Sequence, residues 1–128
     1  MWDLITTDTF DTWLDAQDES VKEDIIAMLG ILKEIGPNLG RPYVDNIRAS
    51  NYPNMKELRV QSSGLPFRGF FAFDPLRQGI ILCAGNKKGL NEEQFYTDMI
   101  AIADAEYAKH LKKLSQPEIV KKSTKKGK

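Results

Sequence analysis

The stretch KELRVQSSGLPFRGFFAFDPLRQGIILCA, residues 56–84, decides the fold of this chain. It contains three runs rich in β-branched and aromatic residues, at 56–61, 67–73 and 79–84, separated by two clusters of turn-forming residues. Such runs joined by short turns predict two consecutive hairpins. The stretch therefore predicts a three-stranded antiparallel sheet at the centre of the protein.

The apolar alternation of the first two strands predicts their register. Val60 on the first strand and Phe67 on the second are expected to face the core. If they pack on the same side, Arg59 lies directly opposite Arg68 on the other face. Two opposed like charges repel each other, which is unfavourable unless an anion lies between them. We expect these arginines to converge where no carboxylate neutralises them.

Helical patterns precede the sheet. Residues 2–6 alternate weakly and predict a short strand, and Asp8 can cap a short helix after it. Ser20 and Glu23 have the spacing of a capping box and predict the start of a second helix, which ends before Gly36. Both helices are expected to lay an apolar stripe on the sheet.

The segments around and after the sheet complete the chain. Residues 38–54 form a long connection with an extended piece expected near 44–48. Asn91 can cap a third helix, whose apolar stripe continues to Leu111. Residues 115–128 contain few apolar residues and five lysines, and predict a basic, disordered tail.

Length and composition point to a single soluble domain. The chain has 128 residues, of which 41% are hydrophobic and 28% charged. Its one cysteine, Cys83, excludes an internal disulfide, and no stretch has the length of a membrane span. We expect a cytoplasmic protein with no membrane partner. The expected architecture over residues 1–114 is α+β, with a short N-terminal strand, two helices packed on a small antiparallel sheet, and a C-terminal helix.

Charge is segregated along the sequence although the formal net charge is zero. Residues 1–40 have a net charge of −7 and residues 41–88 a net charge of +5. Residues 89–114 carry −2 and residues 115–128 carry +4. A fold that keeps this separation presents an acidic and a basic surface, and the basic one can hold a polyanion locally.

Basic side chains are the main candidates for chemistry. The sequence contains no HExxH, GxGxxG, phosphate-loop, nucleophile-elbow or zinc-ligand pattern, so we expect no metal and no cofactor. Arg59, Arg68, Lys87 and Lys88 come from the successive strands, and the sheet is expected to bring them together. Arginine forks can hold phosphate oxygens and stabilise added charge, and a lysine of lowered pKa can transfer a proton. An ordinary solvated surface fits the same residues.

Further residues are candidates for contact with RNA. Lys56 and Arg48 add positive charge near the strands. Phe70 shares the face of Arg68, where it can stack on a base or be covered by a helix. His110 is interpreted as a cation at the end of the third helix rather than as a catalytic group.

An ordered set of motifs resembles a known family over residues 2 to about 114. The set resembles the RelE/ParE toxin superfamily, specifically its phage-derived HigB-like branch, and consists of GPNLGRP at 36–42, Lys56-Glu57-Leu58-Arg59-Val60, Phe67-Arg68, Ile80-Ile81-Leu82 and Lys87-Lys88.

This resemblance implies a RelE-like fold and the toxin half of a type II toxin–antitoxin pair. It implies a metal-independent endoribonuclease that cleaves mRNA on the ribosome, with the ribose 2′-hydroxyl attacking the adjacent phosphodiester. Arg59 and Arg68 would bind the scissile phosphate, and Lys87 or Lys88 would add phosphate contact or proton transfer. The implied partners are the ribosome, mRNA and an antitoxin, expected to be a helix-turn-helix protein that covers the basic patch.

Two alternatives remain open at the level of sequence. ParE-like members of the superfamily inhibit DNA gyrase without nuclease chemistry. The second alternative is that the chain is an inactive relative that binds RNA or a protein partner.

Overall fold

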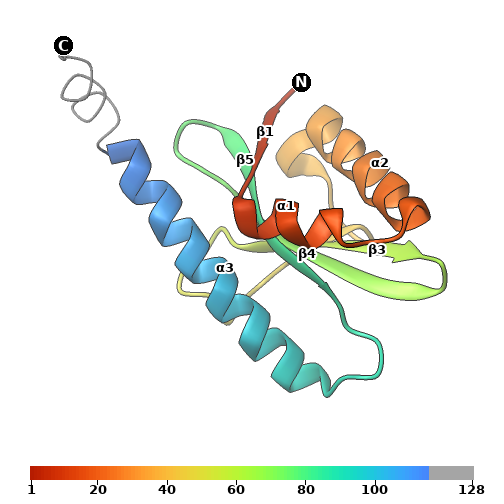
Figure 1. Cartoon of the computed structure of the whole chain (residues 1–128). Coiled ribbons are helices and arrows are strands. Elements are labelled where there is room, and N and C mark those ends of the chain that lie inside the picture. Colours follow the sequence, from red (N-terminus) through yellow and green to blue (C-terminus); the bar gives the residue numbers. More distant parts are fainter. Residues whose placement is uncertain (116–128) are drawn as a thin grey trace, which may run out of the picture.

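A five-stranded sheet lies between two helical layers in the computed structural model, which describes residues 1–115 (Figure 1). The strand order is β1-β5-β4-β3-β2, with α1 and α2 on one face and α3 on the other. The predicted α+β architecture is confirmed. The elements are β1 (Asp3–Thr6), α1 (Asp8–Asp15), α2 (Glu19–Ile35), the 3-10 helix η1 (Gly36–Asn38), β2 (Val44–Asn46), β3 (Lys56–Ser62), β4 (Leu65–Phe73), β5 (Gln78–Asn86) and α3 (Glu92–Ser115).

The β3–β4 hairpin has the register that the sequence predicts. Its turn is tighter than expected, because only Ser63 and Gly64 connect the strands, with φ of 54° and 74°. Positive φ at both central residues is the geometry of a two-residue hairpin turn. The strands therefore pair for one residue further than predicted, which leaves the register unchanged. Arg59 lies opposite Arg68, as predicted.

The N-terminal strand departs from the fully antiparallel sheet that we expected. β1 pairs parallel to β5, with Thr6 beside Ile81 at the end of the ladder. The alternation of side chains indicates which residues face the core, but it does not indicate the direction of a strand. The long connection contributes a strand near the expected place, since β2 pairs antiparallel to β3 at the opposite edge.

The helix starts agree with the sequence only in part. Thr7, not Asp8, caps α1, and its side-chain oxygen accepts a hydrogen bond from the third amide that follows. Asp18 precedes α2, so the capping box predicted at Ser20 is wrong, because Ser20 already lies inside the helix. Asn91 caps α3 as predicted.

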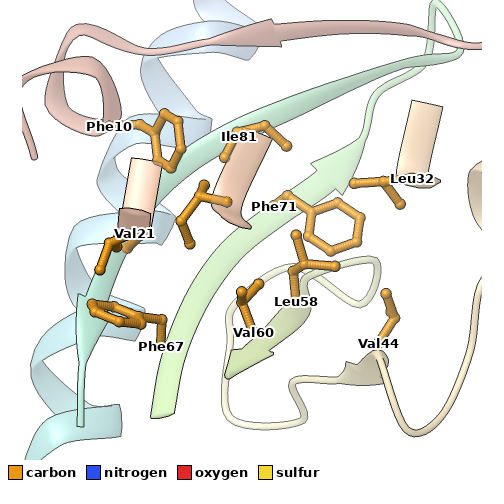
Figure 2. Packing of buried hydrophobic residues seen from close by; sticks show 11 residues of the cluster. Phe10, Val21, Leu32, Val44, Leu58, Val60, Phe67, Phe71 and Ile81 are labelled. Carbon is orange, nitrogen blue, oxygen red and sulfur yellow. The ribbon is translucent and has the colours of Figure 1, made fainter. Parts of the chain in front are cut away.

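One hydrophobic cluster fills the space between the sheet and the helices α1 and α2. Figure 2 shows its side chains pointing toward one another from both helices and from the strands. Val60 and Phe67 lie on this side, as the register argument requires. The labelled members are Phe10, Val21, Leu32, Val44, Leu58, Val60, Phe67, Phe71 and Ile81.

A second hydrophobic cluster joins the opposite face of the sheet to α3. Phe70 is fully buried in it, and its ring centroid lies 6.4 Å from that of Phe95 and 5.9 Å from that of Tyr96. Of the two alternatives for Phe70, cover by a helix is the one observed, so the prediction that Phe70 contacts RNA is wrong.

A buried hydrogen bond attaches the C-terminal half of α3 to the β4–β5 turn. His110 Nε2 lies 2.7 Å from Asp74 Oδ2, and Asp74 also accepts hydrogen bonds from the backbone amides of Leu76 and Gln78. Burial disfavours the ionised carboxyl, but the hydrogen bonds from His110 and these amides lower the pKa of Asp74 below its ordinary value. His110, which we interpreted as a cation at the end of the helix, is thus the buried hydrogen-bond partner of Asp74.

Two further expectations concern membrane spans and the C-terminal tail. Within residues 1–115, no helix has both the length and the apolar composition of a membrane span. The helix α3 includes Ser115, the first residue of the predicted tail. The rest of that tail lies outside the described residues.

Replacing His110 by Ala should lower the free energy of unfolding by about 2 to 4 kcal/mol, because it leaves the buried Asp74 carboxylate without its partner. A lowered pKa means that ionised Asp74 contributes stability above its unfolded pKa of about 3.9, and that this contribution is lost as pH falls below that value. The loss on acidification should be smaller in His110→Ala. Urea unfolding at neutral and acid pH measures both effects.

The matched control is Lys109→Ala, on the same helix, whose side chain is 72% exposed. It should change stability by less than about 0.5 kcal/mol. A His110→Ala protein as stable as the wild type at neutral pH would contradict a stabilising role for the pair.

Candidate functional site

Two arginines from neighbouring strands share the face of the sheet that α3 covers. Arg59 on β3 and Arg68 on β4 are directly opposite each other, and strand alternation puts Arg68 on the same face as Phe70. The side chain of Arg59 is 37% exposed and that of Arg68 is 12% exposed. The convergence of these side chains, predicted from the register, is confirmed.

A buried carboxylate lies beside them, contrary to our expectation. Glu57 is 4% exposed and precedes Arg59 by two residues on the same face of β3. Arg59 donates from Nε and Nη2 to Glu57 Oε2, at 3.1 and 3.0 Å. Arg68 Nε lies 3.8 Å from Glu57 Oε1. The prediction that no carboxylate neutralises the arginines is therefore wrong.

Tyr96 completes the environment of Glu57 from the opposite layer. It lies in the first half of α3, and its hydroxyl donates to Glu57 Oε1 at 2.6 Å. Burial raises the pKa of Tyr96 to about 12, and the hydrogen bond to Glu57 acts in the same direction. Tyr96 is therefore protonated at neutral pH, where it acts as a hydrogen-bond donor.

The two arginines differ in their freedom to bind a ligand. The hydrogen bond with Glu57 raises the pKa of Arg59 further above its ordinary value, so this group stays charged. Arg68 donates from Nη1 to the carbonyl oxygen of Phe67 at 2.9 Å. Its buried Nε has no hydrogen-bond partner among the described residues. Arg68 is thus fixed by its surroundings but keeps unused donor capacity.

Lys87 joins this group from the end of β5. Its Nζ lies 5.6 Å from the centroid of the Tyr96 ring, within the range of a cation–π contact, and 3.4 Å from Glu92 Oε1. Lys88 is exposed in the loop that follows β5. We refer to Glu57, Arg59, Arg68, Lys87 and Tyr96 as the Glu57 cluster.

Two predicted RNA contacts do not join the Glu57 cluster. Lys56 donates from Nζ to Asn46 Oδ1 at 2.9 Å and lines a hollow of about 250 Å³ together with Pro37. Strand alternation turns it to the face opposite Arg59. Arg48 is exposed after β2, and no hydrogen bond or ion pair among residues 1–115 links it to the Glu57 cluster.

Two outer carboxylates border the Glu57 cluster. Asp45 Oδ2 lies 3.3 Å from Arg59 Nη2 and 2.9 Å from Arg41 Nη2, and hydrogen bonds to Arg41 and to the amide of Asn46 lower the pKa of Asp45. Glu92, the partner of Lys87, is 71% exposed. Exposed pairs of this kind contribute little free energy. An incoming anion can therefore replace Glu92 at small cost, whereas Glu57 stays in place.

Sequence reasoning missed Glu57 and Tyr96. A signal for Glu57 was present, because residues two apart on a strand share a face and Glu57 stands two before Arg59. No comparable signal existed for Tyr96, since its position depends on how α3 lies across the sheet. Within the described part of the chain, no group of three or more His, Cys, Asp or Glu side chains is placed to hold a metal ion.

The fold defines a class of protein. It is similar to a solved structure of a mutant of the E. coli toxin RelE in the free state, with a TM-score of 0.59 and 11% sequence identity over 83% of this chain and 96% of that one. The protein therefore has a RelE-like fold, as predicted.

The sequence identifies the family within that class. The family described as phage-derived protein Gp49-like matches residues 12–108, and the chain belongs to this family. It is 43% identical over 116 residues to the putative toxin HigB2 of Mycobacterium tuberculosis, covering 90% of this chain and 57% of that protein. It is 41% identical over 92 residues to the putative toxin HigB3 of the same organism, covering 72% of this chain and 78% of that protein. The chain thus spans little more than half the length of HigB2.

Replacing Glu57 by Gln should destabilise the protein by about 2 kcal/mol, because it removes the charge that neutralises the two arginines. It should also lower the pKa of Tyr96 from about 12, while burial keeps it above the ordinary value of about 10. Chemical unfolding measures the first effect. Ultraviolet titration of tyrosinate, with Tyr96→Phe to assign the signal, measures the second.

The same substitution at the exposed partner of Lys87, Glu92→Gln, serves as the control and should leave stability unchanged within about 0.5 kcal/mol. An unaltered Tyr96 pKa in Glu57→Gln would show that the two groups are not coupled in solution.

Proposed function

We propose that this protein is the toxin of a type II toxin–antitoxin system and that it cleaves translated mRNA on the ribosome without a metal ion. Membership of the Gp49-like family and the similarity to two putative HigB toxins support the toxin role. The observation that carries the nuclease role is the cross-strand pair Arg59 and Arg68, with Lys87 next to it through Tyr96.

The proposed reaction is a transfer within the RNA backbone. The ribose 2′-oxygen loses its proton to solvent and forms a bond to the adjacent phosphorus, while the bond from phosphorus to the 5′-oxygen breaks and that oxygen takes up a proton. The products are a 2′,3′-cyclic phosphate and a 5′-hydroxyl. Negative charge builds up on the phosphoryl oxygens, where arginine forks stabilise it most effectively. Arg59 and Arg68 take this role, and Lys87 or Lys88 contributes phosphate contact or proton transfer to the leaving oxygen.

Glu57 and Tyr96 prepare the arginines in this proposal. Glu57 accepts hydrogen bonds from Arg59 and Tyr96, so its oxygens are already engaged. It therefore acts as a positioning residue that holds Arg59 and Arg68 together in the absence of RNA. Positioning groups in advance avoids part of the reorganisation cost in the transition state.

The partners follow from the same proposal. The net charge of +5 over residues 41–88 favours association with mRNA and ribosomal RNA. A separately encoded antitoxin, expected to be a helix-turn-helix protein, neutralises the toxin. The site of action is the cytoplasm, where translation takes place.

Arg59→Gln and Arg68→Gln should each reduce mRNA cleavage by about 100-fold, because each loses one charged fork at the phosphate. The measurement maps codon-phased cuts in translated transcripts after induction and compares growth arrest. Arg77→Gln is the control, since Arg77 lies over the Trp2 ring in the turn between β4 and β5 and is not part of the Glu57 cluster, and this variant should cleave at the wild-type rate.

Thermal unfolding of the same variants separates chemistry from stability. A folded Arg68→Gln protein with wild-type cleavage would overturn the site assignment. An unfolded one would mean that Arg68 is structural, and Arg68→Lys, which keeps the charge but loses the fork, then provides the test. Intact transcripts together with blocked DNA supercoiling would favour gyrase inhibition instead.

A further inference from the structure

The outward face of α2 carries apolar residues that the described fold leaves uncovered. Ile26 is 56% exposed, and Ile31 and Ile35 are each 43% exposed. These side chains lie outside the stripe of the helix that packs into the first hydrophobic cluster, which contains Val21, Ile25 and Leu32. Ala27 and Gly30 lie between Ile26 and Ile31 at helical spacing, and both are exposed. Clustered apolar exposure of this kind marks an interaction surface.

Gly30 leaves the middle of this face without a side chain, although the fold does not require glycine at this position. A Cβ placed at Gly30 would have no heavy atom within 4 Å, and the backbone there is not in the left-handed region. Glycine in the middle of a helix lowers helix stability relative to other residues. Its effect on the surface is to leave the helix backbone uncovered between the flanking isoleucines, where a side chain of a second helix can pack.

Charge limits what can occupy this face. Glu23 and Glu34 are exposed on the same side of α2, and residues 1–40 have a net charge of −7. An RNA backbone would be repelled here, and a second copy of this chain would bring the same acids against each other. A protein segment that combines apolar side chains with Lys and Arg fits both the apolar strip and the acids around it.

We propose that the outward face of α2, formed by Ile26, Ala27, Gly30 and Ile31 with Glu23 and Glu34 beside them, docks a basic amphipathic helix of a protein partner. The identity of this partner as the antitoxin rests on the proposed function. Because α2 and α3 cover opposite faces of the sheet, this docking surface is separate from the Glu57 cluster (Figure 1). A partner held there leaves the Glu57 cluster uncovered, which differs from the antitoxin position over the basic patch that the family resemblance implies.

The decisive variant is Gly30→Gln. It covers the exposed backbone at this position with the side chain of a good helix former, so it should raise the melting temperature while it weakens partner binding about tenfold or more. A variant that merely damaged the fold would lower both. The probe is a synthetic amphipathic peptide with a leucine stripe and a Lys/Arg face, and calorimetric titration against the full chain gives Kd.

Two further variants test the remaining parts of the proposal. Ala101→Gln places the same side chain at an exposed position of α3 and should leave Kd unchanged. The double variant Glu23→Lys with Glu34→Lys should weaken binding and reduce its dependence on salt, because the basic partner loses its opposite charges.

Each alternative outcome gives a definite answer. An unchanged Kd in Gly30→Gln, or no binding of the probe to the wild type, would overturn the proposal. A wild-type dimer in light scattering that Gly30→Gln abolishes would assign the face to a second copy instead. The cleavage assay without partner keeps the two proposals apart: Gly30→Gln should cleave as the wild type does. Gly30-dependent binding by a chain that cuts no RNA would refute the nuclease and leave the docking surface intact.

Discussion

The pairing of β3 with β4 places the core and the candidate site at the same time. Because side chains alternate along a strand, the register that buries Val60 with Phe67 also sets Arg59 opposite Arg68 on the other face. A shift by one residue would exchange these faces and bury the arginines in the first hydrophobic cluster. The two-residue turn helps to prevent this, since its positive φ values suit only a tight connection.

Glu57 offsets the electrostatic repulsion that this register creates between the two arginines. Two arginines in direct opposition would repel, and burial of Arg68 would add the cost of desolvation. Glu57 sits on the same face and contacts both, and the hydroxyl of Tyr96 supplies a further hydrogen bond. The carboxylate therefore allows the fold to keep two cations next to each other while one of them, Arg59, remains partly exposed. The same arrangement supports both stability and the proposed binding of phosphate.

The sequence predicts the features that depend on residues close together in the chain, and it misses those that depend on contacts between distant segments. The hairpins, the Asn91 cap and the opposed arginines depend on residues close in sequence, and they are confirmed. The direction of β1, the burial of Phe70 and the position of Tyr96 depend on how distant segments pack, which periodicity does not specify. Glu57 is a different case. Its place on the face of Arg59 follows from alternation. The sequence argument compared Arg59 only with Arg68 on the neighbouring strand and did not consider the carboxylate two residues earlier on the same strand.

The contact of His110 with Asp74 and the hydrogen bond of Tyr96 to Glu57 together fix the position of α3 along its axis. These two anchors stand fourteen residues apart on α3, a span of about 21 Å along the helix axis. Apolar packing between them tolerates small displacements because it is not directional, whereas each anchor loses its hydrogen bond if the helix slides by a fraction of a turn. The contact between His110 and Asp74 therefore prevents α3 from sliding along its axis. A substitution that breaks this contact would let the helix shift and would move the Tyr96 hydroxyl away from Glu57 and the arginines.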